Sequence, residues 1–523
     1  MFKQVLPSVT NDRRWGWFIL EAVLLLTILG LAFMKPLSAD PLANGGTGPG
    51  GVGVTNGGDT LKLWLQSDKL VYSDSVCSTV QTTDGNPVGC WRDYSGNGNH
   101  AIQATAANQP TLQNGTGDTL NGHPMLRWDG SNDFLGTSMT VNLAPFTVFV
   151  VFNATNTGFI YEHNIASFTN GGSYLLTETG GTHSVTRLPG PTESWRNLTS
   201  GWGSDGNYRI VAQTFNGTNA SHNMYINGTL QTTTPGNTVD PGLNAINAAL
   251  YIGDRGSGTP VYPINGNYGE FVLYSEALNS AQRLIITNYL QAKFNDSAVN
   301  NISLGLLDRY DGDTTTNNNH DRDVAGIGQE TDGSHTEAHS AGLIVQDNGF
   351  LQDNGDYLMV GHRTPVNGNG SIYVPGGWGA DARYWERDWY IDVTDVVGTA
   401  NGLVTLIFDF SEGGMGGSNP NQTNVTDYRL LARTGIASQF TDIATATGVS
   451  GDQVTFSVNV SALTPYTNFT LGSIDAVSSP TAVEMQNAAA LSPTSFWSTT
   501  SLIVLALSLG TWLTLRQARK VGE

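Results

Sequence analysis

The chain has 523 residues, of which 63 are glycine and only 13% carry a charge. Its formal net charge of -20 repels a phosphate backbone, and this charge excludes nucleic acid as a partner. The length is sufficient for two or three domains, and the abundance of glycine beside asparagine, threonine and serine favours short strands joined by turns. We therefore expect an all-β fold, organised as two consecutive β-sandwich domains.

The N-terminus has the pattern of an export signal. Basic residues precede an apolar run at 15–33, and small residues follow it. The run is long for a signal peptide and contains Glu21, so residues 1–39 are either a signal peptide or an uncleaved N-terminal anchor. Residues 40–60 are rich in glycine and are expected to form a spacer.

Two cysteines, Cys77 and Cys90, lie close together in the segment that should be exported. An oxidising compartment favours a disulfide between them, which would contribute about 3 kcal/mol by constraining the unfolded chain. Two free thiols are the alternative.

Residues 61–295 have the pattern of a first β-sandwich. The run Phe146 to Phe152 is apolar on both faces, which is typical of a central strand buried between two layers. Asn227 and Gly228 separate two short strand-like runs and predict a hairpin turn. Asn279 predicts the start of a helix with a broad apolar stripe, which should pack on the sandwich.

Several motifs of this segment occur in the order found in a known family. They are LWLQSD (63–68), WRDYSGNGNHA (91–101), LRWDGSNDFL (126–135) and GEFVLYSEALNSAQRLIITNYLQAKF (269–294). Together they resemble the LamG-like jelly roll of the concanavalin A-like lectin/glucanase superfamily. The resemblance implies a two-sheet jelly roll that often binds carbohydrate or protein, sometimes through calcium, without specifying one ligand.

Residues 301–476 are expected to form a second β-sandwich domain of unknown function. Strand-like runs recur between glycine, asparagine and aspartate residues, among them Tyr384 to Val393 and Leu403 to Phe410. The motifs DVAGIGQ (323–329) and RDWYIDVT (387–394) resemble an uncharacterised bacterial domain often found after LamG-like modules.

Carboxylate pairs are the first candidates for catalysis, because this superfamily includes glycoside hydrolases. The first sandwich lacks the hydrolase strand motif Glu-x-Asp-x-(x)-Glu. The nearest match is Glu386, Asp388 and Asp392 in the second sandwich, whose spacing is wrong and which we interpret as a strand with a solvated polar face. We expect no catalytic residue and no enzymatic activity.

The loop holding Asp93, Asn97 and Asn99 is the candidate calcium site, because these side chains offer oxygen ligands close together in sequence. Asp129 and Asp133 offer further oxygens. Asx-turns that use the same residues without metal are the alternative. The ligand-binding residues themselves stay unknown.

Two other groups of polar residues are candidate metal sites. His335, Glu337 and His339 would point the same way on an extended strand. An acidic loop at 308–323 contains five aspartates without the order of an EF-hand, and we expect it to be solvated.

The C-terminus resembles a membrane anchor. A linker at 477–495 precedes an apolar run at 496–515, which is long enough to span a bilayer as a helix. The basic tail 516–523 then places the C-terminus in the cytoplasm.

The sequence therefore predicts an exported cell-surface protein that is anchored in the cytoplasmic membrane and binds carbohydrate or a surface protein without catalysis. A purely structural surface protein is one alternative, and a glycoside hydrolase-like enzyme is another.

Overall fold

The computed structural model describes residues 46–475, and all of these belong to one compact unit. The described range has gaps at 59, 140–144, 164–169, 190–194, 200–201, 219–220, 233–248, 256–260, 296–301, 364–367, 398–401, 414–419 and 421–422. The predicted N-terminal signal segment, the linker at 477–495 and the apolar run at 496–515 lie outside the described residues. Within those residues, every helix is too short or too polar to cross a bilayer.

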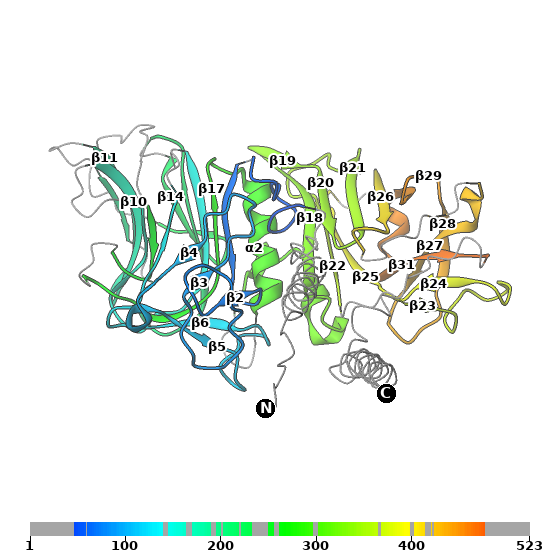
Figure 1. Cartoon of the computed structure of the whole chain (residues 1–523). Coiled ribbons are helices and arrows are strands. Elements are labelled where there is room, and N and C mark those ends of the chain that lie inside the picture. Colours follow the sequence, from blue (N-terminus) through cyan, green and yellow to red (C-terminus); the bar gives the residue numbers. More distant parts are fainter. Residues whose placement is uncertain are drawn as a thin grey trace, which may run out of the picture. The chain divides into compact units, whose positions relative to one another are not determined.

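The described chain is mostly β, with four antiparallel sheets and a single α-helix, α2 (Figure 1). Two sheets form the jelly-roll sandwich of the N-terminal half. The first sheet has the order β15 (Thr229–Leu230), β14 (Asn223–Ile226), β13 (Arg209–Phe215), β8 (Phe146–Phe152), β17 (Asn265–Tyr274), β6 (Met125–Asp129) and β5 (Thr111–Gln113), and β1 (Leu61–Gln66) also pairs with β17. The second sheet has the order β12 (Trp195–Thr199), β11 (Gly181–Pro189), β10 (Asn170–Glu178), β9 (Gly158–His163), β16 (Leu250–Ile252), β7 (Leu135–Thr137), β4 (Ala101–Ile102), β3 (Cys90–Trp91) and β2 (Val71–Tyr72).

Strand β8 confirms the prediction of a central strand buried on both faces. All seven of its residues are buried. Val148 and Val150 point into the core between the two sheets, whereas Phe149 and Val151 point to the opposite face and pack under α2. A continuous apolar run is stable here because both faces of the first sheet are covered.

Helix α2 (Ser280–Phe294) begins at the predicted cap. The side chain of Asn279 accepts a hydrogen bond from the backbone N–H of Gln282, and the Gln282 side chain accepts one from the backbone N–H of Asn279. Twelve of the fifteen helical residues are buried, because the helix packs on the first sheet and also on β18 (Arg322–Glu330) of the second half. One helix therefore closes two sandwiches rather than one.

The glycine-rich segment at 46–58 is packed, although the composition led us to expect a spacer. The backbone oxygen of Gly50 accepts a hydrogen bond of 3.2 Å from Gly326, and the backbone oxygen of Val52 accepts one of 2.9 Å from the Tyr274 hydroxyl. A Cβ added at Gly51 would lie 2.9 Å from the Cβ of Ala338, and the φ of Gly51 is +86°. Glycine is needed at position 51 because its positive φ and the close approach of Ala338 leave no room for a side chain.

The C-terminal half contains the other two sheets, which share a second hydrophobic core. The third sheet has the order β19 (Gly333–His335), β18, β22 (Tyr357–His362), β25 (Trp389–Thr394), β31 (Asn468–Ser473), β24 (Arg383–Trp385) and β23 (Asn369–Gly370), and β31 also pairs with β27 (Tyr428–Arg433), which pairs with β28 (Thr441–Thr445). The fourth sheet has the order β20 (Glu337–Ser340), β21 (Leu343–Asn348), β26 (Leu403–Asp409), β30 (Gln453–Asn459) and β29 (Gly448–Ser450).

One predicted strand, Tyr384 to Val393, is in fact two. Strands β24 and β25 pair with β31 in succession, and the chain between them leaves the sheet. The hydroxyl of Thr470 donates to the backbone oxygens of Trp385 and Arg387 at 2.6 and 2.7 Å. At the break, the buried Thr470 hydroxyl thus supplies hydrogen bonds that a neighbouring strand would otherwise provide.

Candidate ligand-binding face

The register of the second sheet places one row of side chains on its outer surface. Tyr251 on β16 pairs with Glu162 on β9, and Glu162 pairs with Tyr174 on β10. The adjacent row includes Tyr161 and Leu175, which belong to the core between the sheets. Because side chains alternate along a strand, Tyr251, Glu162 and Tyr174 face away from that core.

Aromatic rings extend this row into a continuous surface. The ring of Tyr251 packs against Phe134 with centroids 6.1 Å apart. Phe159 packs against Tyr174 and Tyr262, at 5.4 and 6.0 Å. Tyr262 is 49% exposed, whereas Phe159 is buried below it. We call this surface the aromatic face, defined by Phe134, Phe159, Glu162, Tyr174, Tyr251, Arg255 and Tyr262.

Glu162 is the buried polar group of the aromatic face. Its side chain is 1% exposed, and its Oε1 accepts a 3.1 Å hydrogen bond from Arg255 Nε. Its other oxygen, Oε2, is buried and has no hydrogen-bond partner in the part of the chain that the structure describes. Burial raises the pKa of Glu162 to about 7, against the opposing effect of Arg255.

Asp254 holds the turn beside Glu162. Its Oδ1 accepts hydrogen bonds from the backbone N–H groups of Val261 and Tyr262, and these bonds position the Tyr262 ring. Burial raises the pKa of Asp254, and the charge of Asp254 in turn raises the pKa of Glu162. The guanidinium of Arg255 lies 5.1 Å from the centroid of Phe159.

This arrangement suits a ligand that has both flat apolar surfaces and hydroxyl groups. Tyrosine and phenylalanine rings offer apolar contact area, and the tyrosine hydroxyls add polar contacts. An unpartnered buried acceptor is unfavourable until a donor reaches it, and a ligand hydroxyl would supply that donor to Glu162 Oε2. Convergent aromatic and polar groups of this kind are typical of small-molecule sites.

The predicted calcium loop is a dense hydrogen-bonded turn. Asp93 Oδ1 accepts from the backbone N–H groups of Trp64 and Ser95, and Oδ2 accepts from the Ser95 hydroxyl and the backbone N–H of Asn99. Asn97 and Asn99 donate their side-chain amides to backbone oxygens of β1. The three residues are therefore brought together and brace β1. The calcium site stays a prediction.

Asp129 and Asp133 form a separate turn, which is not part of that loop. Asp133 Oδ2 accepts from the backbone N–H of Asp129 at 2.9 Å, and Asp129 Oδ1 accepts from Ser131. Burial raises the pKa of Asp133 to about 7. The hydrogen bonds of this turn are those of Asx-turns.

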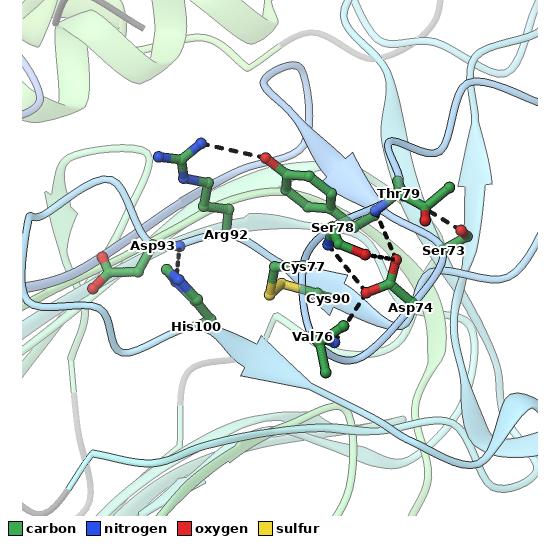
Figure 2. Close-up of a disulfide and its surroundings, with 11 residues drawn as sticks. Ser73, Asp74, Val76, Cys77, Ser78, Thr79, Cys90, Arg92, Asp93 and His100 are labelled. Carbon is green, nitrogen blue, oxygen red and sulfur yellow. Dashed lines mark hydrogen bonds between the residues drawn. A yellow bond between two sulfur atoms is a disulfide. The ribbon is translucent and has the colours of Figure 1, made fainter. Parts of the chain in front are cut away.

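The predicted disulfide between Cys77 and Cys90 is present, and it joins a surface loop to strand β3 (Figure 2). Figure 2 also shows how Asp74 orders this loop. Its carboxylate accepts hydrogen bonds from the backbone N–H groups of Ser78 and Thr79 and from the Ser78 hydroxyl. The backbone hydrogen bond from Ser78 is the main cause that holds the pKa of Asp74 well below its usual range.

His335, Glu337 and His339 do not point the same way along one strand, as an extended segment would require. His335 ends β19, whereas the other two belong to β20. His339 instead lies between two carboxylates, with Nδ1 2.6 Å from Glu412 Oε1 and Nε2 3.3 Å from Glu337 Oε1. Burial lowers the pKa of His335 to about 4.

The acidic loop at 308–323 contacts β25, while several of its residues, Asp311 among them, are exposed to solvent. The backbone N–H of Asp311 donates to Asp392 Oδ2 at 2.8 Å. Burial and neighbouring carboxylates raise the pKa of Asp313 to about 7 and that of Asp392 to about 6. Across the described residues, no three histidine, cysteine, aspartate or glutamate side chains are placed to hold a metal ion.

The carboxylates that most resembled a hydrolase motif are separated in the structure. Glu386 is exposed, and Asp392 bonds to the acidic loop. Asp388 is 1% exposed and pairs with Arg363 Nε and Arg433 Nη2, both at 2.6 Å. Asp388 is therefore an ion-pair centre of the second half.

A hollow lies where α2 meets the hairpin β14–β15, and we call it the seam cleft. Its volume is about 210 Å³, and its lining includes Tyr225, Arg283, Ser280 and Glu330. Arg283 already donates to Ser280 Oγ and stacks 4.8 Å from the Tyr225 ring centroid, and Glu330 accepts from the Tyr357 hydroxyl. These polar groups satisfy one another, so the aromatic face is the better candidate.

The two facing sheets of the N-terminal half define a jelly-roll sandwich protein. Residues 129–282 match the family model of the concanavalin A-like lectin/glucanases superfamily, which confirms the resemblance seen in the motifs. The match contains every residue of the aromatic face. No curated protein matches the chain in sequence.

Solved structures with similarity to the chain include three carbohydrate-related or lectin-like folds. A SAP-like pentraxin from Limulus polyphemus is 14% identical, covers 32% of this chain and 82% of its own, and has a TM-score of 0.25. The CBM40 of a Ruminococcus gnavus IT-sialidase bound to alpha2,3 sialyllactose is 16% identical, covers 27% and 82%, and has a TM-score of 0.22. Domain 4 of a GH43 extracellular arabinanase from Geobacillus stearothermophilus, in complex with arabinotriose, is 18% identical, covers 44% and 97%, and has a TM-score of 0.25.

The residues of the aromatic face were not identified from the sequence. Glu162 and Arg255 are 93 positions apart, and neither stands in a motif. Strands β9, β10 and β16, which carry part of the aromatic face, contain isolated tyrosine and phenylalanine residues, which fit an ordinary core equally well.

Proposed function

We propose that the protein binds carbohydrate on the aromatic face without turning it over. The observation that carries the proposal is the buried, unpartnered Oε2 of Glu162, which lies among aromatic rings on the outer surface of a jelly-roll sheet. The match of residues 129–282 to a superfamily of lectins and glucanases supports the same class of ligand.

The test is a glycan array probed with the full-length chain in detergent, with calcium and with a chelator. We expect binding to a defined set of glycans, and a loss of tenfold or more, about 1.4 kcal/mol or more, on Tyr251→Ala or Glu162→Gln. Tyr373→Ala, a half-buried tyrosine of the second half, is the control that should bind as wild type. If calcium assists, chelation will weaken binding, and Asp93→Ala will weaken it only when calcium is present.

Hydrolysis of a glycosidic bond is the second candidate function. Two observations favour it: the pKa of Glu162 is raised to about 7, which suits a general acid, and the second buried carboxylate Asp254 influences it. The same preparation is assayed for the release of reducing sugar. If the wild type releases reducing sugar at enzyme-like rates and Glu162→Gln abolishes this release, hydrolysis replaces binding as the proposed function.

A purely structural surface protein is the remaining alternative. It would bind no glycan on the array, and substitutions on the aromatic face would leave its assembly with neighbouring surface proteins unchanged.

We further propose that the chain is exported and displayed outside the cytoplasmic membrane by a C-terminal helix at 496–515. The apolar run with basic residues after it supports the anchor, and the disulfide supports an oxidising compartment. External protease should remove residues 46–475 from intact cells. Survival of this region in cells that are sealed, while an unfolded surface control is cut, would refute the topology.

A further inference from the structure

Three ionisable side chains meet in the buried layer between the first sheet and α2. Lys293 is in the last turn of α2, Asp68 follows β1, and Glu270 is on the central strand β17. Lys293 Nζ lies 2.8 Å from Asp68 Oδ1 and 2.8 Å from Glu270 Oε2. The side chains of Lys293, Asp68 and Glu270 are 6%, 14% and 0% exposed.

The surroundings of this trio hold the Glu270 side chain in place. Trp64 Nε1 donates to Glu270 Oε1 at 2.6 Å, and the Tyr289 hydroxyl donates to the same oxygen at 3.0 Å. The ring centroid of Phe294 lies 5.2 Å from Lys293 Nζ. Glu270 is therefore held with Oε2 toward the amine, which also donates to Gln66 Oε1 at 3.1 Å.

The contact between Lys293 and Asp68 differs from that between Lys293 and Glu270. Lys293 Nζ donates a hydrogen bond to Glu270 Oε2, whereas Asp68 Oδ1 has no hydrogen bond in spite of its 2.8 Å distance from Nζ. The opposite oxygen of Asp68 lies 3.1 Å from His123 Nδ1. The nitrogen thus lies in close contact with the Asp68 carboxyl group as well as with that of Glu270.

We propose that this trio is a self-modification site, at which the side chains of Lys293 and Asp68 condense to an amide and Glu270 is the catalytic acid–base. The present structure is the state before the reaction, in which the Lys293 nitrogen contacts the carboxyl group that it would attack.

The step balances without any further reactant. One proton of the Lys293 ammonium passes to the Asp68 carboxylate, which gives an amine and a carboxylic acid. The amine nitrogen then forms a bond to Cγ of Asp68 and passes its second proton to Glu270. Glu270 donates a proton to the hydroxyl of Asp68, the C–O bond breaks, and one molecule of water leaves.

Proximity and burial both favour the reaction. Two groups held in contact react with an effective concentration far above any attainable in solution. Burial raises the pKa of Glu270, although Lys293 opposes this, and a carboxyl with a raised pKa can donate as well as accept a proton. The charge of Lys293 and the hydrogen bond with His123 hold the pKa of Asp68 low against the effect of burial, and the two carboxylates raise the pKa of Lys293, so the first proton transfer is unfavourable.

The bond would join the beginning of the first sandwich to its closing helix. In the sequence, all strands of the two N-terminal sheets except β1 lie between residues 68 and 293. A covalent link across so long a loop restricts the unfolded chain and prevents the helix from being pulled away from β1 under load. Such a link suits a protein that is tethered to a surface at one end.

The test is a peptide map of the full-length chain by mass spectrometry after reduction of the disulfide. We expect one peptide pair that joins the segments of Asp68 and Lys293, lighter than its two parts by one water molecule, with no cleavage by trypsin after Lys293. Glu270→Gln should slow or abolish the link. Lys69→Arg, which changes the exposed lysine next to Asp68, should leave it intact.

Two further variants separate the chemistry from the fold. Lys293→Arg keeps the positive charge and cannot form the amide, so its peptides should appear separately. Asp68→Asn should still react, but with the loss of ammonia instead of water. Separate, unmodified peptides for Asp68 and Lys293 in the folded wild type would overturn the proposal and leave an ordinary buried ion pair. A bond from Lys293 to Glu270 would also overturn it.

Discussion

At the scale of single residues, Glu162 shows how burial on a β-sheet changes the pKa of a carboxyl group. One of its oxygens is bonded to Arg255, which by itself would lower the pKa. Burial outweighs this effect, because the carboxyl group is almost completely removed from solvent, with a side chain that is 1% exposed. The group is therefore more easily protonated than an exposed glutamate.

The raised pKa of Glu162 predicts a dependence of stability on pH. Its folded value of about 7 lies above the ordinary 4.5, so the folded state binds a proton between these values and the unfolded state does not. The free energy of unfolding should fall as pH rises from about 4.5 to 7. In Glu162→Gln this fall should be smaller, by about 1–3 kcal/mol. Urea titrations at several pH values measure it.

Other carboxyl groups limit how much of this effect the variant removes. The pKa values of Asp133 and Asp313 are also raised to about 7, so part of the fall should persist. Glu386→Gln, at an exposed glutamate, is the matched control and should follow the wild-type curve. Identical curves for Glu162→Gln and wild type would show that Glu162 titrates normally.

The sequence predicted the residues that act locally and missed those that act at a distance. Cys77 and Cys90 were paired correctly because they are 13 residues apart and no other cysteine competes. Asp93, Asn97 and Asn99 were correctly placed in one loop, although the pattern could not show that their polar groups bond to β1. No sequence pattern around Glu162 identifies it, because its environment is formed by strands that are distant in sequence.

At the scale of elements, the start of α2 could be predicted from local sequence, whereas the packing of the segment at 46–58 could not. The helix start was predictable from Asn279 and Gln282, because a capping box is complete within four residues. The glycine-rich segment was expected to be a spacer, because its ordered conformation depends on surfaces of α2 and β18 that its own sequence does not contain. Composition alone cannot distinguish flexible glycines from glycines required by close packing.

Gly51→Ala tests the packing of this segment. Its positive φ is unfavourable for alanine, and the new Cβ would lie 2.9 Å from the Cβ of Ala338. Gly85→Ala is the matched control, with a φ of +71° and no atom within 4 Å. We expect Gly51→Ala to be less stable than Gly85→Ala by about 1–3 kcal/mol in urea unfolding, because only the first adds a clash. Equal losses would mean that the segment is not packed as described.

Loss of the disulfide should destabilise the loop and strand that it joins. Cys77→Ser together with Cys90→Ala should lower the free energy of unfolding by about 3 kcal/mol. Reduction of the wild type should produce a similar loss, measured by urea unfolding with and without a reductant. The free energy of unfolding of the double variant should not change when the reductant is added. If that of the wild type does not change either, the pairing is contradicted.

At the scale of the whole molecule, the described chain is one folding unit although it contains two sandwiches. A single hydrophobic cluster includes Ile285 and Tyr289 of α2, Phe149 of the first sheet, and Val324 and Met359 of the third. Two independent modules joined by a linker would each need a separate closing layer. Sharing one helix makes each half depend on the other.

This shared layer predicts cooperative unfolding. The chain should lose tryptophan fluorescence and far-ultraviolet circular dichroism in one coincident transition in urea, because neither half can bury α2 alone. Ile285→Asp, placed in the shared cluster, should lower the midpoint for both signals together. Two separate transitions in the wild type, or a variant that shifts only one of them, would contradict the account.

The central claim is that the aromatic face holds the ligand, and a crystal structure of the chain with the best-binding oligosaccharide from the array tests it most directly. The account predicts a sugar ring stacked on Tyr251 or Tyr174, with one of its hydroxyls donating to Glu162 Oε2. An oligosaccharide bound in the seam cleft, or anywhere else on the chain, with the aromatic face empty, would contradict it.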